Sequence, residues 1–154
     1  MMHLAQLNVG TMLYPQDDPR MAGFMDNLDR VNAIADRAPG FVWRLQDESG
    51  NATSIQAFED PELLVNLSVW ETPEALQKFV WQTVHKQFYA RRAEWFEVMG
   101  KMHFVMWWVE PGEIPTTHEA RERLEYLWAN GPSDYAFGWE DLPNVEMWKE
   151  ARCA

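Results

Sequence analysis

Residues 66–96 read NLSVWETPEALQKFVWQTVHKQFYARRAEWF, and this stretch decides the fold that the sequence predicts. It continues the alternating run LLVNLSVW of residues 63–70, which is typical of a strand. Thr72 and Pro73 then supply an N-cap hydroxyl and a proline at the first helical position, which together start a helix. The predicted helix runs to about Met99, with a break allowed within it, and Gly100 ends it.

The rest of the chain continues the alternation of strands and helices. One helix lies between the start signal Asp17-Asp18-Pro19 and the stop signal Pro39-Gly40, and another follows Thr116 and ends at Gly131. Strands are predicted at residues 3–9, 41–46 and 102–109, with weaker ones at 53–58 and 135–139. The order β-α-β-(β)-β-α-β predicts an α+β fold, a ferredoxin-like antiparallel sheet with helices on one face.

Such a sheet needs a cover on its second face, and a second copy of the sheet would give a dimeric α/β barrel, so we expect a homodimer. We place this domain, with its added third helix, at residues 1–139, and an acidic C-terminal tail at residues 140–154.

Composition excludes several classes of function. The 154 residues carry a net charge of −11, which disfavours nucleic acid and anionic membranes as partners. No apolar run approaches the length of a membrane span, and the N-terminal sequence does not resemble a signal peptide, so we expect a cytoplasmic protein. Residues 73–101 hold five basic and three acidic side chains, so this locally positive segment is where an anionic small molecule would be attracted.

Each predicted strand has one aliphatic face, which suits packing against helices, and the opposite faces of the strands at 3–9, 41–46 and 63–70 carry isolated polar side chains. Isolated polar groups on a covered face need hydrogen-bond partners or a wet cavity. We therefore expect either a polar-lined cavity over this face, or polar contacts with solvent or with a second copy. The side chains concerned are Gln6, Asn8, Arg44, Gln46, Asn66, Ser68 and Trp70.

His85 lies on an aromatic side of the predicted helix, and three interpretations stay open for it. It could be an inert packed histidine, a general acid or base beside a pocket, or an axial ligand of a haem iron. In the haem alternative, ring contacts and propionate partners would come from Trp81, Phe88, Tyr89, Lys86, Arg91 and Arg92. A zinc site is disfavoured because the four histidines show no close pairing, and the single cysteine, Cys153, excludes a cysteine cluster.

Several motifs resemble a bacterial domain-of-unknown-function family. They are Ser68-Val69-Trp70 with Glu71-Thr72-Pro73, the helix with His85, Arg91, Trp95 and Phe96, the run PGFVWRL of residues 39–45, and Trp107-Trp108-Val109 with Pro115-Thr116. That family is similar to the dimeric α/β-barrel superfamily, which includes cofactor-free antibiotic-biosynthesis monooxygenases and haem-degrading monooxygenases. The haem-degrading enzymes use an asparagine on the first strand and a tryptophan and a histidine of the second helix region. The resemblance implies Asn8 for the first, Trp81 or Phe79 for the second and His85 for the third, with a shorter Trp-to-His separation here.

From these observations we expect a monooxygenase-like enzyme acting on a small hydrophobic or aromatic molecule. Three residues are expected to be catalytic: His85, Asn8 and Asn66. In this hypothesis His85 binds haem iron or moves a proton, and the asparagines hold an oxygen atom. Substrate contacts are expected from Arg44, Trp70, Trp81, Tyr89, Arg92 and Trp107. The alternatives are a cofactor-free isomerase or cyclase, or a non-catalytic binder of an aromatic metabolite.

Overall fold

The computed structural model describes residues 2–46, 63–82, 85–97 and 103–142, except the side chains of His85, Phe88 and Tyr89. Its centre is a four-stranded sheet in the order β2-β3-β1-β4, with every neighbouring pair antiparallel. The strands are β1 (His3–Thr11), β2 (Phe41–Arg44), β3 (Leu63–Trp70) and β4 (Phe104–Val109). This order is the ferredoxin-like one, so the predicted α+β fold is confirmed.

The two weaker strands have different outcomes. The strand predicted at 53–58 lies outside the described residues. In place of the strand predicted at 135–139, the structure has a single β-bridge between Phe137 and Met106.

The helices begin where the sequence signals place them, and the first two predicted helices are each divided into shorter elements. The first predicted helix consists of η1 (Pro19–Met21), α1 (Ala22–Met25) and α2 (Leu28–Arg37), and the second consists of α3 (Pro73–Gln82), α4 (His85–Ala90) and η2 (Arg92–Glu94). Thr72 Oγ1 accepts a hydrogen bond from the amide of Ala75 at 3.1 Å, which caps the start of α3. Two elements follow β4, namely α5 (Thr117–Asn130) and η3 (Trp139–Asp141).

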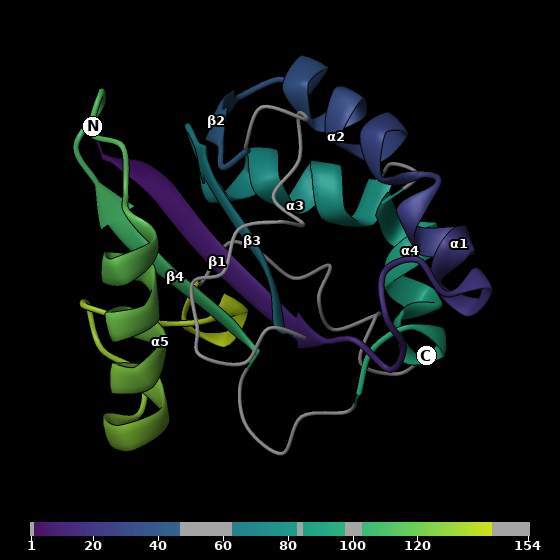
Figure 1. The fold of residues 1–154 in the computed structure, drawn as a ribbon. Coiled ribbons are helices and arrows are strands. Elements are labelled where there is room, and N and C mark those ends of the chain that lie inside the picture. Colours follow the sequence, from purple (N-terminus) through teal and green to yellow (C-terminus); the bar gives the residue numbers. More distant parts are fainter. Residues whose placement is uncertain (1, 47–62, 83–84, 98–102, 143–154) are drawn as a thin grey trace.

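Helices α1 to α4 gather on one side of the sheet in Figure 1. The face beneath them carries Leu4, Trp70 and Met106, which pack with Leu76 and Phe79 of α3. This is the face with the polar side chains, so the expectation that helices cover the aliphatic face and leave the polar one bare was wrong for these helices. The reason is that the same face is polar only toward one end and bears large apolar side chains toward the other.

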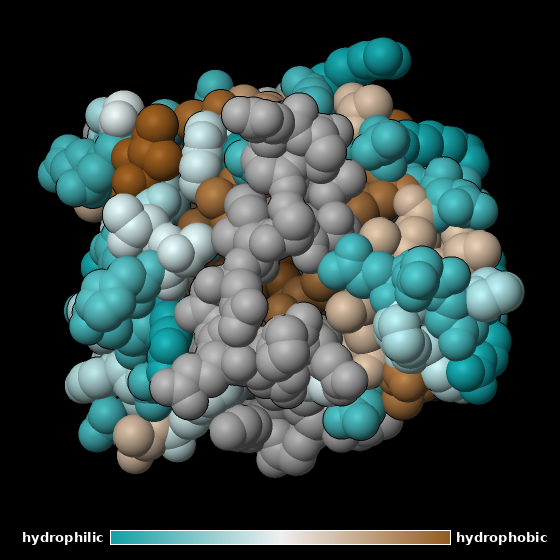
Figure 2. Space-filling view, viewed as in Figure 1, coloured by the Kyte–Doolittle hydropathy of each residue, from teal (hydrophilic) through white to brown (hydrophobic). Residues whose placement is uncertain are grey.

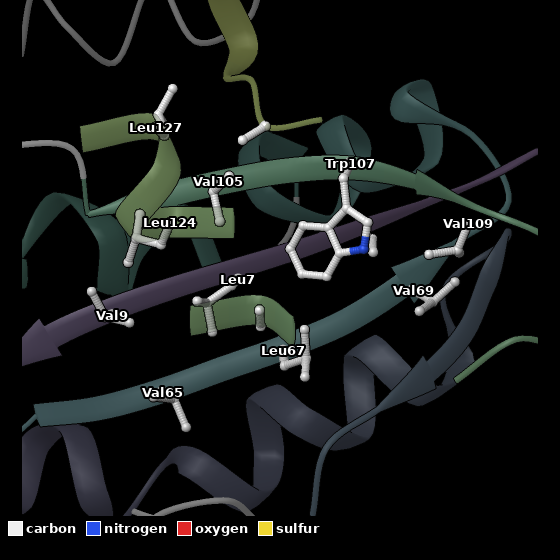
Figure 3. Close-up of a cluster of buried hydrophobic side chains, with 13 residues drawn as sticks. Leu7, Val9, Val65, Leu67, Val69, Val105, Trp107, Val109, Leu124 and Leu127 are labelled. Atoms are coloured by element: carbon white, nitrogen blue, oxygen red, sulfur yellow. The ribbon is translucent and has the colours of Figure 1, made fainter. Parts of the chain in front are cut away.

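Helix α5 covers the opposite, aliphatic face of the sheet. Figure 3 shows Leu124 and Leu127 of α5 over strand residues such as Leu7 and Val105. The expected restriction of helices to one face thus applies to α1–α4, and α5 adds a layer on the other side. In Figure 2 the surface over α5 is largely hydrophilic, consistent with exposed Glu122 and Glu125 on its outer side. No helix within the described ranges has the length and apolarity to cross a membrane.

The chain packs against the domain on both sides of the predicted boundary at residue 139. Trp139 before it and Leu142 after it contact the cluster under α3, and the Trp139 ring stacks on Phe104 with centroids 5.5 Å apart. The division at residue 139 stays a prediction, and residues 143–154 lie outside the described ranges.

Candidate functional site

Four polar side chains on β1 and β3 form a hydrogen-bonded group, here called the amide cluster: Gln6, Asn8, Asn66 and Ser68. Asn8 lies opposite Asn66 in the β1–β3 register, and Gln6 lies opposite Ser68. Because side chains two residues apart on a strand share a face, all four project toward the helices α1–α4. Sequence reasoning had already grouped them on one face but had given roles only to the two asparagines.

Gln6 is hydrogen-bonded to all three other members of this cluster. Its Nε2 donates to Asn66 Oδ1 at 2.8 Å and to Ser68 Oγ at 2.7 Å, and its Oε1 accepts from Asn8 Nδ2 at 3.0 Å. Ser68 Oγ also accepts from Trp70 Nε1 at 2.9 Å. Gln6 is 3% and Ser68 6% exposed, and these are the only buried polar residues in the described part of the chain. Their partners offset the cost of burial and fix the side-chain positions.

The two asparagines leave hydrogen-bonding groups toward the open end of the cluster. Asn66 is exposed and Asn8 is half-buried. Within the described residues, Asn66 Nδ2 has no acceptor and Asn8 Oδ1 has no donor. An amide donor and an amide acceptor, held on neighbouring strands, can bind a carbonyl, hydroxyl or N–H group of a small molecule.

Apolar rings border the amide cluster on the β4 side. Phe104 lies opposite Asn8 and Met106 lies opposite Gln6. Trp139 stacks on Phe104, and Trp81, from the last turn of α3, lies against Trp139 with ring centroids 6.5 Å apart. Trp81 is 7% exposed, so it is a buried second layer behind these rings.

Helix α4 is held at the same end of the sheet by the segment that follows it. Phe96 forms a β-bridge with Met12, Leu13 N donates to Trp95 O at 2.8 Å, and Glu97 N donates to Thr11 O at 2.9 Å. These bonds tie the chain after η2 to the end of β1, just beyond Asn8. The element that carries His85 and Tyr89 thereby lies at the end of the sheet where the asparagines lie. The side chains of His85 and Tyr89 are outside the described residues.

Two predicted substrate contacts lie away from the asparagines. Trp107 is on the opposite face of the sheet, fully buried beneath α5, because it is out of phase with Phe104 along β4 (Figure 3). It cannot share a pocket with Asn8 across the sheet. Trp70 is on the correct face but is 1% exposed and stacks on Phe79 with centroids 5.3 Å apart, so it fills the core under α3.

The two predicted anion-binding arginines have different surroundings. Arg44 Nε bonds Asp36 Oδ1 of α2 at 2.7 Å, and this ion pair joins β2 to the helix layer. Arg92 lies exposed in η2. Its charge helps to lower the pKa of His103, which is lowered chiefly by burial. Arg92 is therefore electrostatically coupled to the beginning of β4, and its expected role in holding a substrate stays a prediction.

Metal-binding chemistry has no support from the described side chains. Nowhere in the described ranges do three His, Cys, Asp or Glu side chains come together as potential ligands. His118 lies on the outer side of α5 with 80% of its side chain exposed.

Comparison with protein-family models decides the family. A family described as a domain of unknown function, DUF3291, matches residues 3–153. The chain belongs to this DUF3291 family. This confirms the resemblance to a domain-of-unknown-function family that the sequence motifs indicated. No curated protein matches the chain.

Two solved structures resemble the DUF3291 chain. One is the NE2512 protein of unknown function from Nitrosomonas europaea, with 14% identity, a TM-score of 0.46, and coverage of 75% of this chain and 97% of that one. The other is a protein from Chloroflexus aurantiacus J-10-fl provisionally assigned as an antibiotic biosynthesis monooxygenase. It has 13% identity, a TM-score of 0.43, and coverage of 75% of this chain and 98% of that one.

Proposed function

We propose that the chain is a small-molecule enzyme, with oxygenation as the favoured reaction, that holds its substrate at the amide cluster. The observation that carries this proposal is the pair Asn8 and Asn66, anchored by buried Gln6 and presenting one acceptor and one donor. Apolar Phe104 lies beside Asn8. The site therefore suits an aromatic molecule that bears a hydroxyl or carbonyl oxygen.

A phenol fits this site chemically. Asn8 Oδ1 can accept a hydrogen bond from the phenol hydroxyl, and Asn66 Nδ2 can donate one to the phenol oxygen. When the phenol is deprotonated, the Asn66 donor stabilises the developing negative charge. The electron-rich ring can then react with dioxygen to give a quinone, with one oxygen atom on the ring and the other released as water. In this proposal His85 is the proton acceptor, since a histidine titrates near neutral pH.

The second candidate function is non-catalytic binding of the same class of molecule. It is favoured by the chemistry of the amide cluster itself, because glutamine, asparagine and serine side chains do not exchange protons near neutral pH. The described part of the site can thus hold a ligand without transforming it. A cofactor-free isomerase or cyclase would in addition need a proton-transfer group such as His85.

The test uses 1-naphthol, with naphthalene as a matched molecule that lacks the oxygen. We expect 1-naphthol, and not naphthalene, to shift the side-chain amide NMR signals of Asn8 and Asn66. Asn66→Ala should weaken 1-naphthol binding by about 2- to 10-fold, the size of one hydrogen bond, whereas Asn130→Ala at the end of α5 should not.

Oxygen uptake with formation of 1,4-naphthoquinone, lost in His85→Ala, would support the enzyme. Binding without oxygen uptake would support the binder. If neither compound shifts these signals, the amide cluster does not hold such ligands.

Haem binding through His85 remains a further proposal, and the described residues fit it only in part. Lys86 and Arg92 are exposed at α4 and η2, where they could meet carboxylates, but Trp81 is buried against Trp139 rather than open to a ring. The oxidation of a phenol at the amide cluster does not require haem. A hemin titration should give a saturating Soret band that His85→Ala changes and His118→Ala does not. An unsaturable spectrum, alike in all three proteins, would exclude this ligand.

The homodimer and the cytoplasmic location also remain predictions. The polar sheet face that a second copy was expected to cover is already buried within the single chain, since Gln6 and Trp70 on that face are 3% and 1% exposed. A dimer would therefore use other surfaces, such as β2 with its exposed Val42. Light scattering should give about twice the chain mass of 18.1 kDa, and a value near that mass would contradict the prediction.

A further inference from the structure

A hollow of about 380 Å³ lies on the side of β4 that shares a face with Leu4, the face covered by α1–α4. It lies between Trp108 and the segment 132–142. We call it the Trp108 hollow. In the registers of β1, Trp108 lies opposite Leu4, whereas Phe104 lies opposite Asn8. Four residues along a strand correspond to roughly 13 Å, so this hollow is separate from the open asparagine end of the amide cluster. Its volume falls in the range of small-molecule sites.

Aromatic rings line one side of the Trp108 hollow. Trp108 is 37% exposed, although its neighbours Trp107 and Val109 in β4 are 0% and 3% exposed. Phe137 lies beside it with ring centroids 5.8 Å apart. Phe137 is fixed against β4 by two backbone hydrogen bonds with Met106, of 2.8 and 3.0 Å. An exposed tryptophan beside a fixed second ring offers the electron-rich surfaces to which cations are attracted.

Two carboxylates, Asp134 and Asp141, also line the Trp108 hollow, and none of the described residues that line it is basic. Asp141 Oδ2 accepts a hydrogen bond from the amide of Gly138 at 3.0 Å, which fixes this side chain. The nearby Arg123 bonds Glu119 and the carbonyl of Tyr135, so its charge is directed to α5 and the adjoining backbone. Among its described residues, the hollow therefore combines aromatic surface with negative charge and no lining cation.

The wall of the Trp108 hollow is preformed. Ser133 and Ala136 exchange backbone hydrogen bonds of 2.9 and 3.2 Å, and Ser133 Oγ accepts from the amide of Tyr135 at 3.2 Å. These bonds fix the turn that carries Asp134. A preformed site loses less conformational entropy on binding, which favours affinity for a small ligand.

We propose that the Trp108 hollow binds a small organic cation, an amine or a quaternary ammonium compound. Carboxylates alone would attract any cation, and aromatic rings alone would attract any apolar molecule. The combination selects an organic cation with apolar substituents, because such a cation interacts with the rings and the carboxylates at once. This site is independent of the function proposed for the amide cluster.

Three probes test the proposal by calorimetry at low salt: choline; 3,3-dimethylbutan-1-ol, its neutral isostere of the same size; and ethanolammonium, a smaller cation without the methyl groups. We expect choline to bind with a Kd in about the millimolar range, and the neutral isostere not to saturate. Tighter binding of choline than of ethanolammonium indicates that the rings dominate, and the reverse indicates that the carboxylates dominate. Equal binding of choline and its neutral isostere, or no binding of either cation, would overturn the proposal.

Variants assign the binding to this hollow. Trp108→Leu should weaken choline binding by about 3- to 30-fold, and Trp108→Phe should weaken it less, because the ring contribution falls from tryptophan to phenylalanine. Asp134→Asn should also weaken binding, whereas Asp17→Asn, which removes the same charge from the exposed loop after β1, should not. Thermal melting confirms that each variant is folded. Unchanged affinity in folded Trp108→Leu would place the cation elsewhere and overturn the proposal.

Discussion

Asn8 lies directly opposite Asn66 across the β1–β3 pairing, and both are hydrogen-bonded to the buried side chain of Gln6. The pair thus has a rigid support inside the sheet and open hydrogen-bonding atoms outside it. A change at Gln6 should therefore affect the site without touching a ligand. Substitutions can therefore distinguish the supporting role of Gln6 from the ligand-binding roles of Asn8 and Asn66.

Replacing Gln6 by methionine keeps the volume of the side chain and removes its polar atoms. The hydrogen bonds to Asn66, Ser68 and Asn8 are lost, although Ser68 retains Trp70 and the two asparagines can turn to solvent. We expect Gln6→Met to lower the free energy of unfolding by about 1–2 kcal/mol in urea titration. It should also weaken 1-naphthol binding, because the asparagines lose their anchor.

Gln46→Met is the matched control, because Gln46 is exposed beyond the end of β2. This variant should change stability by no more than about 0.5 kcal/mol. Equal stability of the two variants would mean that the hydrogen bonds of Gln6 make no net contribution.

The alternation of residues along the strands predicted the sheet and grouped the amide cluster on one face. The alternation did not show which face of the sheet each helix covers. Leu4 and Trp70 share a face with Asn8 and Asn66, and their apolar area brings α3 onto a face that appeared polar when only its amides were considered. Similarly, Trp107 and Trp108 are adjacent and chemically alike in sequence. Only the register of β4 with β1 places one under α5 and the other at a hollow.

The ion pair between Arg44 and Asp36 should couple β2 to α2. The two side chains are joined by bonds of 2.7 and 3.2 Å and are 13% and 44% exposed. A double-mutant cycle with Arg44→Met and Asp36→Asn isolates this pair from the other contacts of Arg44. We expect a coupling energy of about 0.5–1 kcal/mol from urea titration, decreasing in high salt. Additive effects of the two substitutions would show that the pair is energetically neutral.

Gly40 and Gly112 offer a comparison of backbone strain with steric overlap. Both have a left-handed backbone, with φ of 84° and 91°, so alanine costs about 1–2 kcal/mol at either position. A Cβ at Gly40 would lie 2.5 Å from Ala75 Cβ at the start of α3, whereas at Gly112 nothing lies within 4 Å. The Gly40 carbonyl also accepts from Glu71 N at 2.7 Å, which limits the movement of this turn.

We therefore expect Gly40→Ala to reduce the free energy of unfolding by about 1–3 kcal/mol more than Gly112→Ala, the usual cost of overpacking. Urea titration of both variants measures the difference. Losses of equal size would mean that the turn moves away from α3 at no cost.

His103 should make the stability of the fold depend on pH. Burial, with a smaller effect of Arg92, lowers its pKa in the folded state below the ordinary value of 6.5. The unfolded chain then binds a proton at a higher pH than the folded one. The stabilisation is complete above about pH 6.5 and is lost as the pH falls below it, at a rate of at most about 1.4 kcal/mol per pH unit for one proton.

His103→Gln should therefore flatten the decline in the free energy of unfolding between pH 7.5 and 5, measured by urea titration at each pH. His118→Gln is the control, because the His118 side chain is 80% exposed on α5. Arg92→Gln should raise the pKa of His103 in an NMR titration, since it removes the smaller of the two causes and leaves the burial. An identical decline in wild type and His103→Gln would show that this histidine is not the group responsible. The protonation of carboxylates would then account for the loss of stability.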